Sequence, residues 1–234
     1  MISAVAAIRF IRSLLFYIAF YGGSVFCVLG TAVAGLFGHK ALQRGCEVWS
    51  RYHRVCARWL LGIRIVVEGE LPTGHVLVAL RHESFFEAID LPALLQRPAI
   101  FAKDELLRIP LWGRLGAAYG LIGVDRDRGS AALRAMIAAA RQHEAEGRML
   151  AIFPEGTRIP HGEIAPMQAG FAALYKLLGR PVVPIALDSG ALYHRWIKRP
   201  GTVTYRVGEP IPAGLPRPEA EARVAAAINA LNPA

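Results

Sequence analysis

Cysteine is scarce in this chain, which contains three cysteines among 234 residues. Cys27, Cys46 and Cys56 are too few for a disulfide framework and too widely spaced for a CxxC metal site. All three lie in or near apolar sequence, where a free cysteine packs as a small hydrophobe. The cysteines therefore predict packing roles, and they give no indication of an oxidising compartment.

Several sequence motifs of known chemistry are also absent. The chain has no GxSxG nucleophile elbow, no HExxH zinc motif and no recognisable nucleic-acid-binding motif, and it contains no internal repeat or low-complexity tract. These absences argue against a hydrolase of the nucleophile-elbow type, an HExxH metalloenzyme and a nucleic-acid-binding protein. They also predict that the chain holds no metal.

Acidic residues are outnumbered, with 18 Asp and Glu against 27 Lys and Arg, so the formal net charge is +9 at pH 7. A basic surface favours an anionic partner, such as phospholipid headgroups, a phosphorylated substrate, an acidic carrier protein or nucleic acid. Charge alone does not choose among them. Nucleic acid fits least well, because the basic residues are dispersed along the chain.

The apolar residues, 54% of the chain, are concentrated at the N-terminus. No charged residue lies between Ser13 and Gly38, and roughly 20 residues suffice to cross the hydrocarbon core as a helix. Gly22 and Gly23 interrupt this run and invite a break, so a hairpin that dips into one leaflet fits as well as a spanning helix. Positive residues flank the run more heavily on its C-terminal side, which predicts that the remainder lies on the cytoplasmic face. A cleaved signal peptide is the competing interpretation, although a basic, aromatic helix follows the run.

Residues 41–62 combine tryptophan and tyrosine with several arginines in a helical pattern. Such a helix suits a membrane interface, but the same pattern also suits a helix packed on a protein core. We therefore expect a membrane-associated helical region over residues 1–62, followed by a catalytic or binding domain over residues 63–234.

Beyond residue 62 the pattern changes to short β-rich runs that alternate with helical stretches. This alternation predicts an α/β fold with a mainly parallel sheet flanked by helices. The predicted strands are 63–67, 76–80, 99–103, 119–124, 149–153, 182–187 and 202–207. The predicted helices are 84–96, 106–115, 130–146, 168–178 and 218–231.

His82 follows directly after the apolar strand 76–80, at the edge of the sheet where open α/β folds place their sites. Glu87 lies five residues later, so on one continuous helix the two side chains would point about 140° apart. If His82 instead precedes the helix and Glu87 lies in its first turn, the carboxylate can hold one ring nitrogen. The other nitrogen could then accept a proton from a hydroxyl.

Two plain alternatives remain for this pair. A lone histidine in a loop is usually a surface residue. Ser84-Phe85-Phe86-Glu87 also has the pattern of a capping box, in which Glu87 would bond the backbone N–H of Ser84.

A second segment of interest begins with the apolar run 149–153. Pro154-Glu155-Gly156-Thr157-Arg158 then places a carboxylate, a glycine, a hydroxyl and a guanidinium within one turn. Such a turn can bind phosphate through the arginine and its backbone N–H groups. It can equally be an ordinary solvated turn.

Together these segments resemble the glycerolipid acyltransferase family, which includes 1-acylglycerol-3-phosphate acyltransferases. His82 and Glu87 resemble its His and acidic residue separated by four positions, and 153–158 matches its Phe-Pro-Glu-Gly-Thr-Arg block without change. The segments 119–126 and 182–186 resemble its two weaker blocks. The family's acid is most often Asp, so Glu87 is one methylene longer, and Asp90 is too far along the chain to replace it. The family commonly has a polar residue such as Asn where this chain has Arg81.

The resemblance implies that His82 acts as a general base and that Glu87 orients it. It implies that the acceptor is bound by Arg126, Glu155, Gly156, Thr157 and Arg158. Lys103, at the end of a predicted strand, is a further binding candidate or a solvated strand end.

The implied reaction moves a fatty-acyl group from acyl-CoA or acyl-carrier protein to the free hydroxyl of a lysophospholipid, with lysophosphatidic acid expected as acceptor. The implied enzyme needs no cofactor and works on the cytoplasmic face of a membrane, the inner membrane if bacterial. The rivals are the same chemistry on glycerol 3-phosphate, a lyso-ornithine lipid or another acceptor, and a non-catalytic lipid-binding protein.

Overall fold

The computed structural model describes residues 4–125 and 129–233 and forms a seven-stranded sheet flanked by helices. The strands are β1 (Ile63–Glu68), β2 (Leu77–Leu80), β3 (Ala99–Lys103), β4 (Leu121–Val124), β5 (Leu150–Ile152), β6 (Val182–Leu187) and β7 (Gly201–Val207). The helices are α1 (Ala4–Gly35), α2 (His39–Cys56), the π-helical turn η1 (Ala57–Leu61), α3 (Phe85–Leu94), α4 (Asp104–Leu107), α5 (Trp112–Tyr119), α6 (Gly129–Ala145), α7 (Ala169–Leu178), α8 (Gly190–Tyr193) and α9 (Arg217–Ile228).

The sheet has the order β1-β7-β6-β2-β5-β3-β4. Neighbouring strands are parallel throughout, except that β6 and β7 are antiparallel. The pair β1–β7 therefore runs opposite to the rest, which makes the sheet mixed but mainly parallel. This arrangement confirms the predicted fold class.

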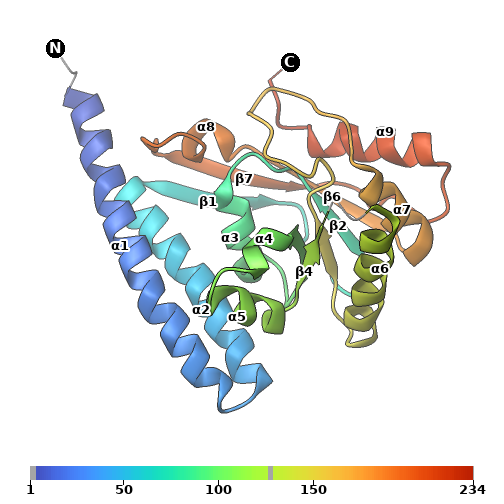
Figure 1. Cartoon of the computed structure of the whole chain (residues 1–234). Coiled ribbons are helices and arrows are strands. Elements are labelled where there is room, and N and C mark those ends of the chain that lie inside the picture. Colours follow the sequence, from blue (N-terminus) through green and yellow to red (C-terminus); the bar gives the residue numbers. More distant parts are fainter. Residues whose placement is uncertain (1–3, 126–128, 234) are drawn as a thin grey trace.

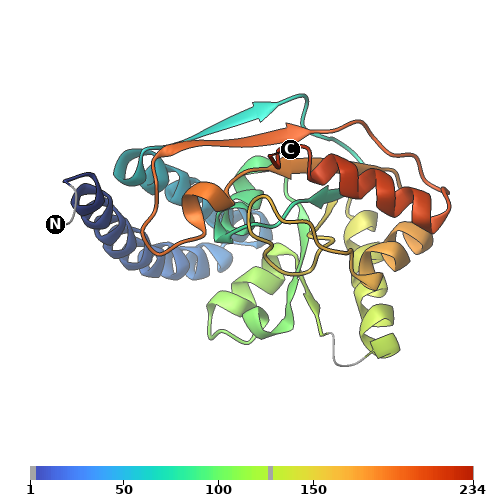
Figure 2. The ribbon, with the colours of Figure 1, turned by 90° about the horizontal axis from the view of Figure 1, so that it is seen from above.

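Both faces of the sheet are covered, so its central strands are apolar along their whole length. In β2, Val78 and Leu80 pack in the core beneath α3, whereas Leu77 and Ala79 pack in the core beneath α7 and α9. All four residues are buried. Figures 1 and 2 show α6, α7 and α9 at the opposite end of the molecule from α1 and α2.

The apolar N-terminal run forms one continuous helix, α1, which packs side by side with α2 (Figure 1). Of the two alternatives that the sequence left open, the break at Gly22 and Gly23 is not found, and Gly23 instead lies at a contact between the two helices. A Cβ placed on Gly23 would lie 2.1 Å from Oη of Tyr52, a residue of α2, whereas a Cβ on Gly22 would meet nothing within 4 Å. The glycine thus lets two helices approach closely.

Within the described ranges, α1 is the single helix that is long and apolar enough to cross a membrane by length and composition. Only 17% of its most apolar window is buried in the protein. The following helical region, α2 with η1, combines a side packed in the core with an exposed aromatic side chain. His53 in α2 is fully buried, whereas Trp59 in η1 is 74% exposed. Gly62 separates η1 from β1 in a left-handed conformation. The division of the chain at residues 62 and 63 stays a prediction.

Several predicted elements differ from the structure at their ends. The single helix expected over 106–115 is two helices, α4 and α5, because Pro110 interrupts it and Leu111 has a positive φ of 60°. Tyr119 ends α5 and does not begin a strand. The short helix α8 was not predicted.

Candidate active site

His82 and Glu87 meet as the sequence predicts. His82 lies in the loop after β2, and Glu87 lies in the first turn of α3. Nδ1 of His82 is 2.8 Å from Oε1 of Glu87. The His82 side chain is 15% exposed and that of Glu87 is fully buried. The carboxylate therefore contacts the ring from inside the protein through Nδ1.

The capping box is also present, so the two interpretations of Glu87 hold together. Oε1 of Glu87 accepts hydrogen bonds from the backbone N–H groups of Glu83 (2.6 Å) and Ser84 (2.7 Å). Oε2 accepts from the Ser189 hydroxyl at 2.6 Å. Burial alone would raise the pKa of Glu87, but the hydrogen bonds from His82, Ser189 and Ser84 outweigh it and lower this pKa. Glu87 is thus held ionised beside the imidazole.

The imidazole of His82 borders a large cavity. Its ring stacks on Phe153, with 4.1 Å between the ring centroids. The cavity measures about 1260 Å³ and is lined mainly by apolar side chains, which include Phe20, Ile89 and Trp112. Ligand pockets typically measure about 300–1,000 Å³, so this cavity has room for a long apolar ligand that reaches His82.

The turn after β5 lies beside His82 because β5 and β2 are parallel neighbours. Gly156 has φ of +69°, a left-handed conformation that favours glycine, and its N–H donates to the Phe153 carbonyl. Thr157 and Arg158 are exposed and line the cavity with Gly156. The Arg158 guanidinium lies 4.0 Å from the centroid of the Phe85 ring. The structure therefore brings this turn and His82 to one cavity.

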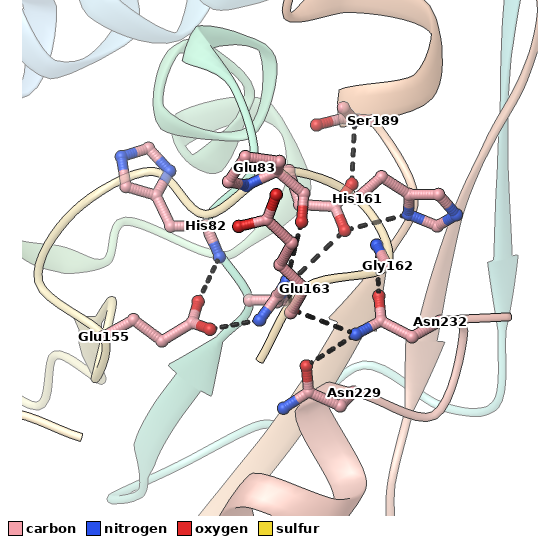
Figure 3. A network of polar contacts seen from close by, with 12 residues as sticks. His82, Glu83, Glu155, His161, Gly162, Glu163, Ser189, Asn229 and Asn232 are labelled. Atoms are coloured by element: carbon pink, nitrogen blue, oxygen red, sulfur yellow. Dashed lines mark hydrogen bonds and ion pairs between the residues drawn. The ribbon is translucent and has the colours of Figure 1, made fainter. Parts of the chain in front are cut away.

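Glu155 differs from its neighbours in the same turn. It is 1% exposed, is not among the residues that line the cavity, and pairs with the buried Arg81. Oε2 of Glu155 also accepts a hydrogen bond from the backbone N–H of His82 at 3.2 Å. Figure 3 shows Glu155 against the backbone of His82, with the imidazole pointing away from it. The Glu155 carboxylate is thus enclosed by protein partners, and a direct contact of Glu155 with an acceptor stays a prediction.

Arg81 and Glu83 were not identified from the sequence, although both are fully buried. Arg81 pairs with Glu155 and also donates to the carbonyl groups of Pro160 and Glu163. Glu83 accepts from the Gly190 N–H at 2.8 Å, and its Oε1 is 3.0 Å from Nδ1 of His161 (Figure 3). Burial raises the pKa of Glu83, and the bonds from Gly190 and His161 oppose this rise.

Ser189 is a further site residue that sequence reasoning missed. Its hydroxyl bonds Glu87 from the segment after β6, a strand that is the parallel neighbour of β2. The available signal was its position just beyond a predicted apolar strand, at the same edge of the sheet as His82. Gly190 follows it, and a Cβ there would lie 2.9 Å from Oε2 of Glu83.

The two remaining predicted binding residues have different outcomes. Lys103 is exposed at the end of β3 and lines the cavity, and its role in binding stays a prediction. Arg126 lies outside the described residues. In the part of the chain that the structure describes, no three His, Cys, Asp or Glu side chains gather as a metal site would require.

Comparisons with known proteins identify the family. An acyltransferase family model matches residues 63–188. The 1-acyl-sn-glycerol-3-phosphate acyltransferase of Pseudomonas aeruginosa is 30% identical over 209 residues, which cover 87% of this chain and 81% of that protein. The 1-acyl-sn-glycerol-3-phosphate acyltransferase alpha of Mus musculus is 28% identical over 84% of this chain and 71% of its own length.

The fold is also found in a solved structure. The crystal structure of the 1-acyl-sn-glycerophosphate acyltransferase from Thermotoga maritima matches with a TM-score of 0.77 at 24% identity, and the match covers 95% of each chain. The family model spans more than half of the sequence, and it includes both the loop that carries His82 and the turn that carries Arg158. The chain therefore belongs to the acyltransferase family.

Proposed function

We propose that this protein transfers a fatty-acyl group from acyl-CoA or acyl-carrier protein to the sn-2 hydroxyl of lysophosphatidic acid, giving phosphatidic acid. The observation that carries the proposal is the bonded pair of His82 and Glu87 at the edge of a large apolar cavity. The names of the relatives from Pseudomonas aeruginosa and Mus musculus support this acceptor.

In the proposed mechanism, Nε2 of His82 removes the proton from the acceptor hydroxyl as its oxygen attacks the thioester carbonyl. Glu87 holds the proton on Nδ1 and stabilises the imidazolium that forms. The tetrahedral intermediate then collapses with cleavage of the carbon–sulfur bond, and the imidazolium returns the proton to the departing thiolate. The products are the new ester and the free thiol, and no acyl-enzyme is formed.

The acceptor's phosphate is assigned to the turn that contains Gly156, Thr157 and Arg158. Arg158 offers a planar fork that suits two phosphate oxygens, while the turn supplies backbone donors. Lys103 and Arg126 are the further cationic candidates. Glu155 is assigned a positioning role, because it joins the backbone of His82 to Arg81.

The α1–α2 hairpin is proposed to hold the site at the cytoplasmic face of a membrane. The exposed face of α1 is apolar, and Leu36 and Phe37, where the hairpin turns, are 83% and 82% exposed. Arg44 and Arg51 are exposed on the adjoining α2. Because burying these arginines in hydrocarbon would be costly, we infer that the hairpin enters one leaflet and does not cross the bilayer.

The test is an acyl-transfer assay with purified protein, labelled palmitoyl-CoA or acyl-carrier protein, and a panel of acceptors. The panel contains lysophosphatidic acid, glycerol 3-phosphate, lyso-ornithine lipid and other lysophospholipids. Loss of a general base predicts that His82→Ala lowers kcat by about 10²–10⁴-fold. His75→Ala is the matched control, because His75 is exposed in the loop before β2.

Each outcome bears on a different part of the proposal. Product from another acceptor in preference to lysophosphatidic acid would reassign the substrate. No product from any acceptor would favour the non-catalytic lipid-binding alternative. A His82→Ala enzyme as fast as wild type would remove the proposed base.

A further inference from the structure

Lys198 is a buried cation in the segment between α8 and β7. It is 8% exposed, although its neighbours Ile197 and Arg199 are exposed. This segment is fixed to α1 at two points. The backbone N–H of Lys198 donates to Oγ of Ser13 at 2.9 Å, and the Tyr17 hydroxyl donates to the Trp196 carbonyl at 2.7 Å. The position of Lys198 is therefore set by the helix that we assign to the membrane.

The protein holds the ammonium group of Lys198 with neutral partners. Nζ donates to the Tyr193 carbonyl and lies 4.1 Å from the centroid of the Tyr193 ring. Among the residues with described placement, no carboxylate forms an ion pair with Lys198. Burial, and then the positive charge of Arg158, lower the pKa of Lys198 to about 8. A buried ammonium without an anion is costly, so a bound anion would relieve a cost already present in the fold.

Arg158 is exposed on the same cavity and, like Lys198, has no described carboxylate as a partner. Its guanidinium lies on the ring of Phe85, and no carboxylate of the described ranges pairs with it. Arg158, Lys198 and His82 all line the one cavity. Two cations without described carboxylate partners thus border the same cavity as His82, and such cations suit a phosphate group.

We propose that Lys198 is a substrate-binding residue and that it and Arg158 together hold the phosphate of the lipid acceptor. This inference rests on the proposed function and deepens it. Lys198 supplies a compact ammonium charge and Arg158 a planar guanidinium. The phosphate is therefore bound by residues from two distant segments of the chain. The lipid is favoured over the phosphates of the acyl donor, because the segment that carries Lys198 is bonded to α1, beside which a lysolipid would enter.

The experiment compares the steady-state kinetics of wild type, Lys198→Met and Lys198→Arg, with acceptor and acyl-CoA varied separately. Loss of one charge-assisted hydrogen bond predicts that Lys198→Met raises KM for lysophosphatidic acid by about tenfold or more. We expect kcat to change less, KM for acyl-CoA to stay constant, and Lys198→Arg to recover most of the loss. Lys176→Met is the matched control, because Lys176 is exposed on α7, which packs on the opposite face of the sheet.

Equilibrium binding of lysophosphatidic acid and of monoacylglycerol, without acyl donor, gives a second measurement. Lys198→Met should weaken binding of lysophosphatidic acid and leave binding of monoacylglycerol, which has no phosphate, unchanged. Equal weakening for both lipids would show a structural role and overturn the proposal. A rise in KM for acyl-CoA alone would place the phosphate on the donor and also overturn it.

The two proposals fail in different ways. If wild type forms no product but binds lysophosphatidic acid in a Lys198-dependent manner, the enzymatic function fails and the phosphate site stands. If wild type is active and Lys198→Met leaves both KM and binding unchanged, the phosphate site fails and the enzymatic function stands. Thermal unfolding of each variant identifies any loss of fold.

Discussion

Glu87 performs two tasks with one carboxylate. As the third residue of α3 it closes the helix N-terminus by accepting N–H bonds from Glu83 and Ser84, and it also bonds Nδ1 of His82. The extra methylene relative to Asp does not prevent this contact, because His82 lies outside the helix and folds back over its first turn. The residue that orients the proposed base is therefore itself fixed by the backbone.

We predict that Glu87→Gln lowers kcat by about 10²-fold or more, because the imidazolium of His82 loses its anionic partner. KM should change little, since Glu87 does not line the cavity. The double variant with His82→Ala should be no slower than His82→Ala alone, because the two residues act as a unit. Glu70→Gln, at an exposed position after β1, is the control. Additive losses in the double variant would contradict the pairing in catalysis.

Arg81 links two elements of the site, since it joins the end of β2 to the segment 155–163. Its side chain and those of Glu83 and Glu155 are almost completely buried. Asn232 also bonds the Gly162 N–H and the Glu163 carbonyl, which ties this segment to the C-terminal end of the chain (Figure 3). The loop with the proposed phosphate-binding turn is thus held against the end of β2, next to the loop that carries His82.

We predict that Arg81→Met lowers the free energy of unfolding by about 3–5 kcal/mol, because it leaves buried carboxylates without their cation. Denaturant unfolding measures this change. Adding Glu155→Gln should recover part of the loss by removing one of the unpaired charges. Arg64→Met on the exposed edge of β1 is the matched control and should change stability little. An equally small effect of Arg81→Met would show that the buried contacts of Arg81 contribute nothing to stability.

The close contact between α1 and α2 predicts opposite effects of two glycine substitutions on stability. Gly22→Ala and Gly23→Ala differ by one position in the same helix, but only the second collides with Tyr52. Gly22→Ala should raise stability by up to about 1 kcal/mol through helix propensity, whereas Gly23→Ala should lower it by about 1–3 kcal/mol through overpacking. Thermal unfolding in detergent compares them. If both substitutions changed the stability in the same direction, the close contact between α1 and α2 at Gly23 would not matter for stability.

For the whole molecule, the proposed arrangement places the tip of the α1–α2 hairpin in the lipid and the sheet outside it. Replacing Leu36 and Phe37 together by Glu should reduce flotation of the protein with phosphatidylglycerol vesicles, because two charges would enter hydrocarbon. Leu177→Glu, a partly exposed position on α7, is the control and should float as wild type does. If only Leu177→Glu lost its binding to the vesicles, the membrane contact would lie at the other end of the molecule.

The α/β class, the positions of most strands and the possible contact of His82 with Glu87 were predicted from the sequence. These features depend on local signals, namely apolar runs of strand length, a capping pattern and a short separation along the chain. Pro110 was a local signal as well, and the division of 106–115 at this residue was predictable in principle.

Which residues meet across long separations in the chain depends on how the strands and helices pack. Glu155 was expected to face the substrate, but Arg81 turns it inward from 74 residues away. Ser189 reaches Glu87, and Lys198 reaches the cavity, only because β6 lies beside β2 and the following segment packs on α1. Gly23 is a helix contact only because Tyr52 lies opposite it. Such pairings depend on the order of strands and helices in space, which hydrophobic periodicity does not encode.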